Sequence, residues 1–238
     1  VQLKPLTLRG LHYQVVSAGI YENVENNYKS LSRLMVRLRE AGVIAFEWIV
    51  DNLRDTDKPS SWSSLRDYVE TVRDAYRMDF WARLPEYVCV IVEKDAVAGM
   101  LKIVTQEYDI ALHVIRGFVS LSFVHSIARE WREIEKPIYA YYLGDHDPSG
   151  HDIERDMREK LIRYSERSDV TWKRLAITPQ QIAEYGVIPL PVKGSDSRAR
   201  AFMERYGERG AELDALRPDV MRELLKDAIE SHIPSAGW

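Results

Sequence analysis

The stretch Ile138 to Gly150, IYAYYLGDHDPSG, places two aspartates directly after a run of apolar and aromatic residues. The run Ile138 to Leu143 is short and almost continuously apolar, which is typical of a strand buried on both faces of a sheet. Because side chains alternate along extended backbone, Asp145 and Asp147 should point the same way and His146 elsewhere. Two carboxylates so arranged suit Mg²⁺, which prefers oxygen ligands and keeps several waters.

A third acid follows a second predicted strand. Tyr87 to Val92, YVCVIV, is again a buried-strand pattern, and Glu93 stands at its carboxyl end. In open α/β sheets the ligand site lies outside the carboxyl ends of the strands. The pattern around these strands predicts helices over 95–106, 120–134 and 150–164 and strands over 110–115 and 171–177. This alternation predicts an α/β fold with a parallel sheet and with Glu93, Asp145 and Asp147 at one rim.

Neighbouring polar residues have simpler interpretations. Mg²⁺ prefers oxygen, so we interpret His146 and His151 as hydrogen-bonding surface groups. Lys94 is interpreted as part of the start of a helix, where acidic side chains such as that of the next residue are favoured. Ser149 is expected to cap the helix that begins near Gly150.

Composition sets only loose bounds on function. The 238 residues are 45% hydrophobic and 29% charged, as in an ordinary globular protein, and a net charge of −4 carries no global nucleic-acid signature. The single cysteine, Cys89, falls inside a predicted core strand, which excludes a disulfide framework and predicts a buried, inert thiol. No apolar segment is long enough to span a bilayer and no secretory signal begins the sequence, so we expect a cytoplasmic protein.

Residues 1–54 are predicted to form a separate unit. Helices over Leu8 to Ala18 and Val24 to Ala41, followed by an extended stretch from Val43 to Val50, give the outline of a small winged-helix domain. This unit has seven basic and five acidic side chains. On the second helix, the side opposite the apolar stripe carries a set of cations suited to DNA phosphates, although a solvated helix face explains them equally well: Lys29, Arg33 and Arg37.

The remaining chain divides into three parts. Residues 55–84 have the composition of a linker followed by a connecting helix over 65–80. Residues 85–192 hold the predicted parallel sheet. Residues 193–238 form a C-terminal helical extension, with helices expected over 200–208 and 218–231.

Tyr13 is a candidate nucleophile in the first unit. It follows Arg9 by four residues on a predicted helix, so the two side chains share a face and the guanidinium can hold a phosphate beside the phenol. An unperturbed phenol has a pKa of about 10 and needs a cation, a base or a metal to act as a nucleophile. The alternative is a tyrosine that only packs on an amphipathic helix.

Together these motifs carry a family resemblance. Glu93 with Lys94 and Asp95, Arg116-Gly117 and the Gly144 to Gly150 segment resemble a Toprim domain, in the variant found in the topoisomerase VI A subunit and the related meiotic double-strand-break transesterase. The Arg9 to Tyr13 segment resembles the Arg-x-x-x-Tyr motif that this family carries on a CAP-like winged helix. Ala211 to Leu216 is more weakly similar to a segment before the family's last helix.

The resemblance implies Mg²⁺-dependent DNA strand cleavage by tyrosine transesterification, with a phosphotyrosyl-DNA intermediate as in a topoisomerase. Tyr13 would be the nucleophile, Arg9 its phosphate partner and Glu93 a general acid or base that also ligates metal; Asp145 and Asp147 would hold the ion. The implied partners are double-stranded DNA, a second copy in a homodimer and a GHKL-type ATPase B subunit. In the family the tyrosine of one subunit meets the metal site of the other, which implies that Tyr13 lies far from Glu93 within one chain.

Two other functions stay open on the sequence. One is a Toprim nuclease that hydrolyses DNA with metal-activated water and uses Tyr13 only structurally. The other is a non-catalytic DNA-binding or assembly protein whose acids bind metal for stability. Only eight residues precede Arg9, so the family's amino-terminal segment that meets the ATPase subunit is either absent from the protein or lies outside this sequence, and a stand-alone role is also open.

Overall fold

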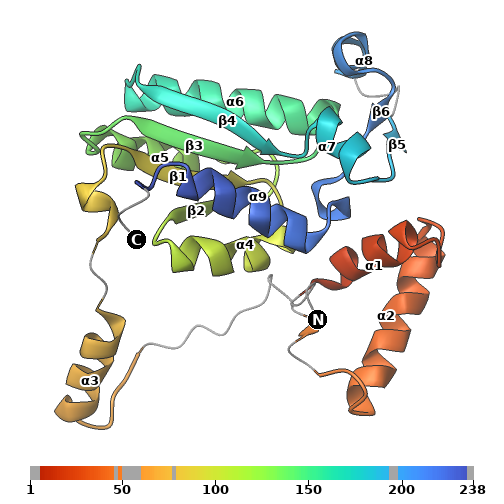
Figure 1. Ribbon diagram of the computed structural model, residues 1–238, viewed down its shortest axis with the longest axis horizontal. Helices are drawn as coiled ribbons and strands as arrows, with labels where there is room; N and C mark the ends of the chain where they lie inside the picture. Colours follow the sequence, from red (N-terminus) through yellow and green to blue (C-terminus); the bar gives the residue numbers. More distant parts are fainter. Residues whose placement is uncertain (1–5, 46–47, 50–59, 77–78, 193–197, 235–238) are drawn as a thin grey trace.

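A four-stranded parallel sheet organises the chain (Figure 1). In this computed structural model, the described residues are 6–45, 48–49, 60–76, 79–192 and 198–234. The strands are β1 (Tyr87–Val92), β2 (Ala111–Val114), β3 (Ile138–Leu143) and β4 (Val170–Ala176), in the spatial order β2-β1-β3-β4. Every pairing is parallel, which confirms the predicted α/β class. No helix in the described part of the chain is long and apolar enough to cross a membrane.

The strands form the sheet because their side chains divide between two apolar layers. Val88, Val90 and Val92 of β1 face one layer, and Cys89 and Ile91 face the other. Hydrophobic burial on both faces explains the continuous apolar runs in the sequence. Cys89 is fully buried, as predicted.

Helices cover both faces of the sheet. The helices α4 (Asp95–Glu107) and α9 (Pro218–Glu230) pack on the face that includes Val90, and α5 (Leu121–Arg132) and α6 (Pro148–Ser165) pack on the opposite face (Figure 1). Trp131 of α5 and Met157 of α6 are among the fully buried side chains. Since α9 joins the same core as β1 and α4, the C-terminal extension is part of the sheet's hydrophobic core.

The first unit contains the two predicted helices, α1 (Leu8–Ser17) and α2 (Glu25–Glu40), which lie beside the sheet domain in Figure 1. Thr7 caps α1 by accepting a hydrogen bond from Gly10 N–H at 3.1 Å. The expected extended stretch over 43–50 does not form a strand within its described residues. An isolated parallel bridge joins Leu6 to Ile49 instead, and 46–47 and 50 lie outside the described residues. The two helices are present, but a winged-helix fold is not shown.

Helix α3 (Leu65–Ala75) stands apart from the sheet (Figure 1). It is shorter than the predicted helix over 65–80 because Tyr76 already has extended backbone angles. None of its residues is buried. Residues 77–78 and the first half of the expected linker, 55–59, lie outside the described residues, and a 3-10 turn over Trp81–Arg83 leads into β1.

The segment after β4 returns the chain to the rim of the sheet. It contains α7 (Pro179–Glu184), a short antiparallel pair of β5 (Leu190–Pro191) and β6 (Arg209–Gly210), and α8 (Ala199–Tyr206). A 3-10 turn, η3 (Leu213–Ala215), then precedes α9. This return brings residues 211–214 beside the loop that follows β3, where His146 and Ala211 form an antiparallel bridge.

Candidate functional site

The carboxyl ends of β1 and β3 bring two buried acids together. Glu93 and Asp145 are only 7% and 8% exposed. The Glu93 carboxylate accepts hydrogen bonds from Asp145 N–H at 3.0 Å and from the Tyr142 hydroxyl at 3.3 Å. Burial raises the pKa of Glu93, and the Asp145 N–H opposes this rise. Since adjacent parallel strands end at the same rim, these acids meet where the sequence predicts.

Arg174 of β4 holds the backbone of the loop that carries Asp145. Its guanidinium donates to the carbonyl oxygens of Gly144 at 2.9 Å and Asp145 at 3.2 Å, and it pairs with Glu154 at 2.7 Å. The loop is therefore fixed by charge-assisted hydrogen bonds from the neighbouring strand.

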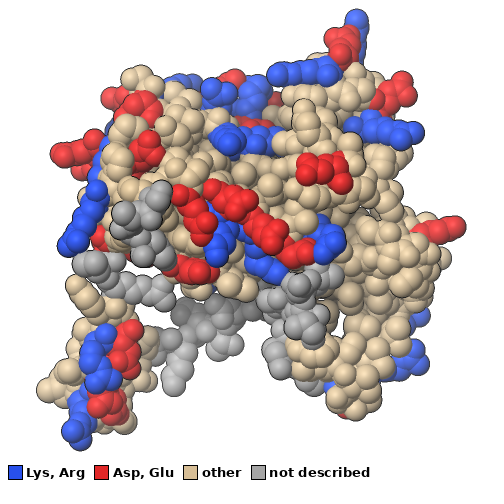
Figure 2. All heavy atoms as spheres, in the orientation of Figure 1, with Lys and Arg blue, Asp and Glu red and all other residues tan. Residues whose placement is uncertain are grey.

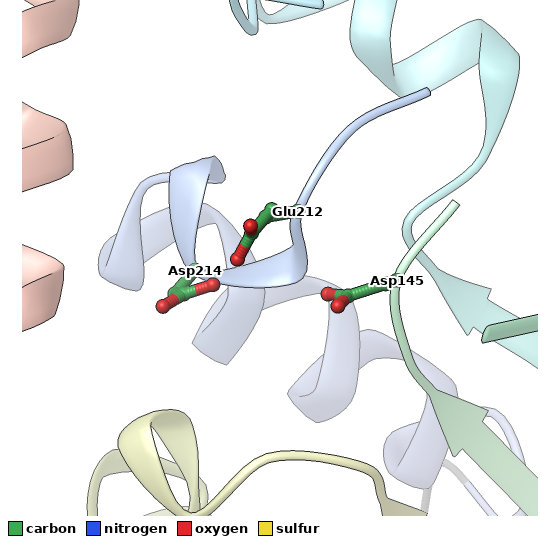
Figure 3. Close-up of side chains that lie close together, drawn as sticks. All are labelled: Asp145, Glu212 and Asp214. Atoms are coloured by element: carbon green, nitrogen blue, oxygen red, sulfur yellow. The ribbon is translucent and has the colours of Figure 1, made fainter. Parts of the chain in front are cut away.

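A cluster of three acids around one lysine lies next to Glu93. The carboxylates of Asp145, Glu212 and Asp214 converge from the loop after β3 and from the segment that includes η3 (Figure 3). One ligand oxygen from each lies within 4.8 Å of the others. The Lys94 ammonium contacts all three, at 2.9 Å from Asp145, 2.5 Å from Glu212 and 2.8 Å from Asp214. We call Lys94 and these three residues the acid cluster.

Burial and charge set the protonation of the acid cluster. Burial raises the pKa of Asp145 to about 7, and Glu93 adds to the rise while Lys94 and the Leu213 N–H oppose it. Burial lowers the pKa of Lys94, but the three carboxylates outweigh this effect and leave the pKa above its ordinary value. Burial also raises the pKa of Glu212, and contact with Lys94 brings it below the ordinary value. Lys94 therefore stays a fixed cation inside the cluster.

Asp147 has a different role from Asp145. Its carboxylate caps α6 by accepting a hydrogen bond from Gly150 N–H at 2.7 Å. The expectation that Ser149 caps a helix beginning near Gly150 is wrong, because α6 already begins at Pro148 and Asp147 is its cap. Asp147 still acts electrostatically on Glu93 and raises its pKa.

The interpretation of His146 as a surface group is also wrong. His146 is 1% exposed: its ring packs against Phe202 and Tyr206, with ring centroids 5.1 and 5.0 Å apart, and its backbone pairs with Ala211. Its ring lies 2.9 Å from His151, and burial lowers the pKa of His146 to about 4. His151 is partly buried. Both rings therefore pack in the structure as neutral groups.

Gly150 permits the close turn that holds Asp145. A Cβ atom on Gly150 would collide with the Asp145 backbone carbonyl oxygen, so we expect Gly150→Ala to lower the free energy of unfolding by about 1 to 3 kcal/mol. Urea denaturation measures this change. Ser149→Ala on the same turn is the control and should change the unfolding free energy by less than about 0.5 kcal/mol. Equal stability of the two variants would contradict the close approach.

Tyr13 and Arg9 of α1 lie at the edge of the acid cluster. The Arg9 guanidinium is 3.9 Å from Glu212 and 3.8 Å from Asp214, and Tyr13 lies one helical turn from Arg9 on the same face of α1. Tyr13 is 7% exposed; burial, Asp214 and Glu212 raise its pKa to about 12, and Arg9 opposes the rise. The resemblance implies that Tyr13 lies far from Glu93 within one chain, and this stays a prediction; Tyr13 is nevertheless close enough to Glu212 and Asp214 of its own chain for their charges to raise its pKa.

A cleft of about 720 Å³ separates α1 and α2 from the start of α4. Its lining combines cations with an aromatic ring and acids, including Arg9, Tyr28, Arg39, Lys94, Arg116 and Asp214. Arg116 and Gly117 both have positive φ, at 55° and 87°. Left-handed backbone at a non-glycine residue carries strain, which clusters at functional sites. Tyr13 is outside this lining, but its partner Arg9 is in it.

The predicted DNA-binding residues lie on the opposite side of α2 from its buried residues. Lys29, Arg33 and Arg37 are exposed and spaced by four residues, so they share one helix face. Lys29 forms an ion pair with Glu25 at 2.8 Å. Leu31 and Met35 are the buried residues of α2. The three cations are available to a partner but do not line the cleft.

Sequence reasoning missed three members of the acid cluster. The sequence pattern indicates only a helix start at Lys94. Glu212 and Asp214 lie in a segment, Ala211 to Leu216, that is only weakly similar to the family. The available signal was the Glu-x-Asp spacing of Glu212 and Asp214 around buried Leu213, which directs two acids to one side of a short turn. Leu213 N–H also donates to the Asp145 carboxylate at 2.8 Å, so the turn is fixed to the β3 loop.

The acid cluster fits a hard divalent cation by its chemistry. All three convergent side chains offer oxygen, the ligand type that Mg²⁺ prefers. One oxygen of Asp214, Oδ2, is buried and has no hydrogen-bond partner among the described residues. Lys94 is the competing cation, so an ion must share the three carboxylates with the ammonium or displace it.

Comparisons with protein-family models and with curated proteins find no match for this chain. The function is therefore argued from the geometry of the site.

Proposed function

We propose that this protein cleaves DNA strands by transesterification, with Tyr13 as the nucleophile and Mg²⁺ as the cofactor. The observation that carries the proposal is the position of α1, which places Arg9 at 3.9 Å from Glu212 and 3.8 Å from Asp214 and Tyr13 one helical turn further along the same face. A phenol, a guanidinium and a group of oxygen ligands are the parts that phosphodiester cleavage needs: a nucleophile, a phosphate partner and charge stabilisation.

Each step of the proposed reaction is assigned to a residue of this chain. The Tyr13 oxygen forms a bond to phosphorus, and the bond from phosphorus to a deoxyribose oxygen breaks. Glu212 accepts the phenol proton and then gives it to the departing deoxyribose oxygen. Arg9 donates hydrogen bonds to a non-bridging phosphate oxygen. Asp145, Glu212 and Asp214 would hold a Mg²⁺ ion, which would supply positive charge to the phosphate.

The resemblance to the Toprim domain of the topoisomerase VI A subunit supports the same reaction. Glu93, Asp145 and Asp147 stand in the family's order, and the family's chemistry is DNA cleavage through a phosphotyrosine. The family also implies a homodimer and an ATPase partner. Here Arg9, on the same helix as Tyr13, contacts Glu212 and Asp214 within one chain, so we propose that the tyrosine acts on DNA held at its own acid cluster.

The direct test is incubation of the protein with supercoiled DNA and Mg²⁺, stopped with denaturant and run on a gel with and without protease. We expect cleaved DNA that enters the gel only after proteolysis, because the strand end is bound to protein. Free nicked or linear DNA without protease treatment, or DNA left intact, contradicts transesterification by this chain.

Hydrolysis is the second candidate, and the burial of Tyr13 favours it. The Tyr13 side chain is 7% exposed, so its hydroxyl reaches a phosphate only if the site opens. Burial and two acids raise its pKa to about 12, which disfavours the phenolate that attacks phosphorus. In this alternative the acid cluster activates water, and Tyr13 only packs against Glu212. Retention of cleavage in Tyr13→Phe would select hydrolysis.

Metal binding can be measured without DNA. We expect Mg²⁺ or Mn²⁺ at about one hundred times the dissociation constant to stabilise the wild type by about 2.7 kcal/mol, since the ion binds only the folded site. Asp214→Asn should lose most of this stabilisation because Asp214 supplies a buried ligand oxygen. Asp219→Asn, which lies in α9 and pairs with Arg217, is the matched control and should keep it. Calorimetric unfolding with and without the ion gives the result, and a wild type unaffected by divalent cations would contradict the metal site.

A further inference from the structure

We propose that a second surface, the groove between α6 and α8, binds the phosphate backbone of duplex DNA; this inference rests on the proposed function and extends its substrate site. The groove has a volume of about 870 Å³. Residues of α6 form one wall of the groove, and residues at and within α8 form the other. Five arginines line it: Arg155, Arg158, Arg163, Arg198 and Arg205. We call this surface the arginine groove.

The charge of the arginine groove is positive after its acids are paired. Asp152 contacts Arg155 at 2.7 Å and Arg198 at 3.4 Å. Glu159 contacts Arg155 at 2.7 Å, and Glu154 contacts Arg174 at 2.7 Å. The three lining acids therefore each have a cation.

Three arginines supply the remaining charge. Within the described residues, Arg158, Arg163 and Arg205 form no ion pair with a carboxylate. All three are exposed. Arginine is the side chain best suited to phosphate, because its planar group donates two parallel hydrogen bonds.

Aromatic rings stabilise the wall of the groove that α8 forms. Phe202 and Tyr206 lie one helical turn apart, with ring centroids 5.1 Å apart, and Tyr206 lies 4.6 Å from the His151 ring of α6. Arg205 stands over the Tyr206 ring at 5.2 Å. The rings hold α8 against α6 and keep the arginine side chains on the open side.

The arginine groove is connected to the candidate site at two points. Pro148, at the start of α6, lines the groove and directly follows Asp147. Arg198 lies over the exposed ring of Phe118 at 5.6 Å, and Phe118 follows Gly117, which lines the cleft beside Lys94. Phe118 and Arg198 therefore link the lining of the cleft to that of the arginine groove.

The dimensions also suit a duplex. Pro148 and Arg163 mark the ends of the lining along α6, and at 1.5 Å per residue this length is about 22 Å. One DNA strand has a phosphate about every 3.4 Å of helix axis, so the groove covers about six base pairs. By contrast, acidic side chains gather over α9 on the face seen in Figure 2. In α9 itself, Glu223, Asp227 and Glu230 are exposed. That face repels the same backbone.

The test is the binding of a fluorescein-labelled DNA duplex of 20 base pairs, measured by anisotropy without divalent metal at several salt concentrations. Arg158→Glu/Arg205→Glu should weaken binding at least tenfold at 0.15 M salt and reduce the slope of log affinity against log salt by about 2. The control is Arg129→Glu/Lys226→Glu, which makes the same change of net charge on α5 and α9, both outside the groove, and should weaken binding less than threefold. Circular dichroism confirms that both variants fold.

The outcomes separate this inference from the proposed function. Equal affinity of the groove variant and the control variant overturns the inference and leaves cleavage at Tyr13 untouched. Loss of binding in the groove variant alone supports the inference even if the wild type forms no covalent adduct with DNA. A wild type that does not bind the duplex, or that binds an RNA duplex of equal length more tightly than DNA, overturns the assignment of duplex DNA.

Discussion

Tyr13→Phe should abolish the protein-DNA adduct, with a loss of at least about a thousandfold in its rate of formation, because the phenylalanine has no oxygen to bond to phosphorus. The fold should survive, since the buried ring stays and only the hydroxyl group is lost. The adduct is measured as labelled DNA retained with protein after denaturation. Binding of uncleaved duplex should stay within threefold of the wild type.

Tyr28→Phe is the matched control for this experiment. Tyr28 lines the cleft and its ring packs edge-on against His12, so it is a second tyrosine near the site. We expect this variant to keep adduct formation within about fivefold. If the Tyr28 variant loses the adduct and the Tyr13 variant keeps it, Tyr13 is not the nucleophile.

Lys94→Met should destabilise the metal-free protein by about 3 to 5 kcal/mol, because removing one partner of a buried ion pair leaves the other charges uncompensated. Lys94 is the cation shared by three carboxylates, and the Asp214 side chain is only 1% exposed. We further expect Mg²⁺ to restore part of the lost stability, and to stabilise the variant more than the wild type, since the ion no longer competes with an ammonium. Urea denaturation with and without Mg²⁺ measures both effects.

The control for that variant is Lys102→Met, an exposed lysine on α4. It should change the unfolding free energy by less than about 0.5 kcal/mol and should not alter the response to Mg²⁺. A Lys94 variant as stable as the wild type, with no added response to the ion, would show that the ammonium does not hold the acid cluster together.

The sheet could be predicted because a short run of neighbouring residues determines each of its strands. β1 and β3 were predicted with the bounds that the structure has, since each is a short apolar run buried between two helical layers. The acids at the carboxyl ends follow from parallel topology, which places Glu93 beside Asp145.

The acid cluster could not be predicted in the same way, because its contacts are non-local. Lys94 lies 118 residues from Glu212 and 120 from Asp214 along the chain, and neither strand periodicity nor motif spacing joins positions so far apart. The same limit explains the error at His146, whose ring packs against Phe202 and Tyr206 of the distant helix α8. The prediction for His146 used only its side-chain type, which is typical of a surface group.

The remaining differences between prediction and structure arise where a side chain or a segment makes another local contact than the predicted one. Alternation along an extended segment predicts that Asp145 and Asp147 both ligate a metal ion. The Asp147 carboxylate instead caps the start of α6 by accepting a hydrogen bond from Gly150 N–H. In the first unit the helices have clear apolar stripes, whereas the expected strand after α2 is replaced, in the described residues, by a single bridge between Leu6 and Ile49.

The proposed chemistry is tested most directly by locating the covalent bond. The protein is incubated with DNA and Mg²⁺, denatured, digested with nuclease and trypsin, and analysed by tandem mass spectrometry. Trypsin releases the peptide from Gly10 to Lys29, which contains Tyr13, Tyr21 and Tyr28. We predict that the nucleotide remnant is on Tyr13. A remnant on Tyr21, on Tyr28 or on no tyrosine of this peptide would contradict the account.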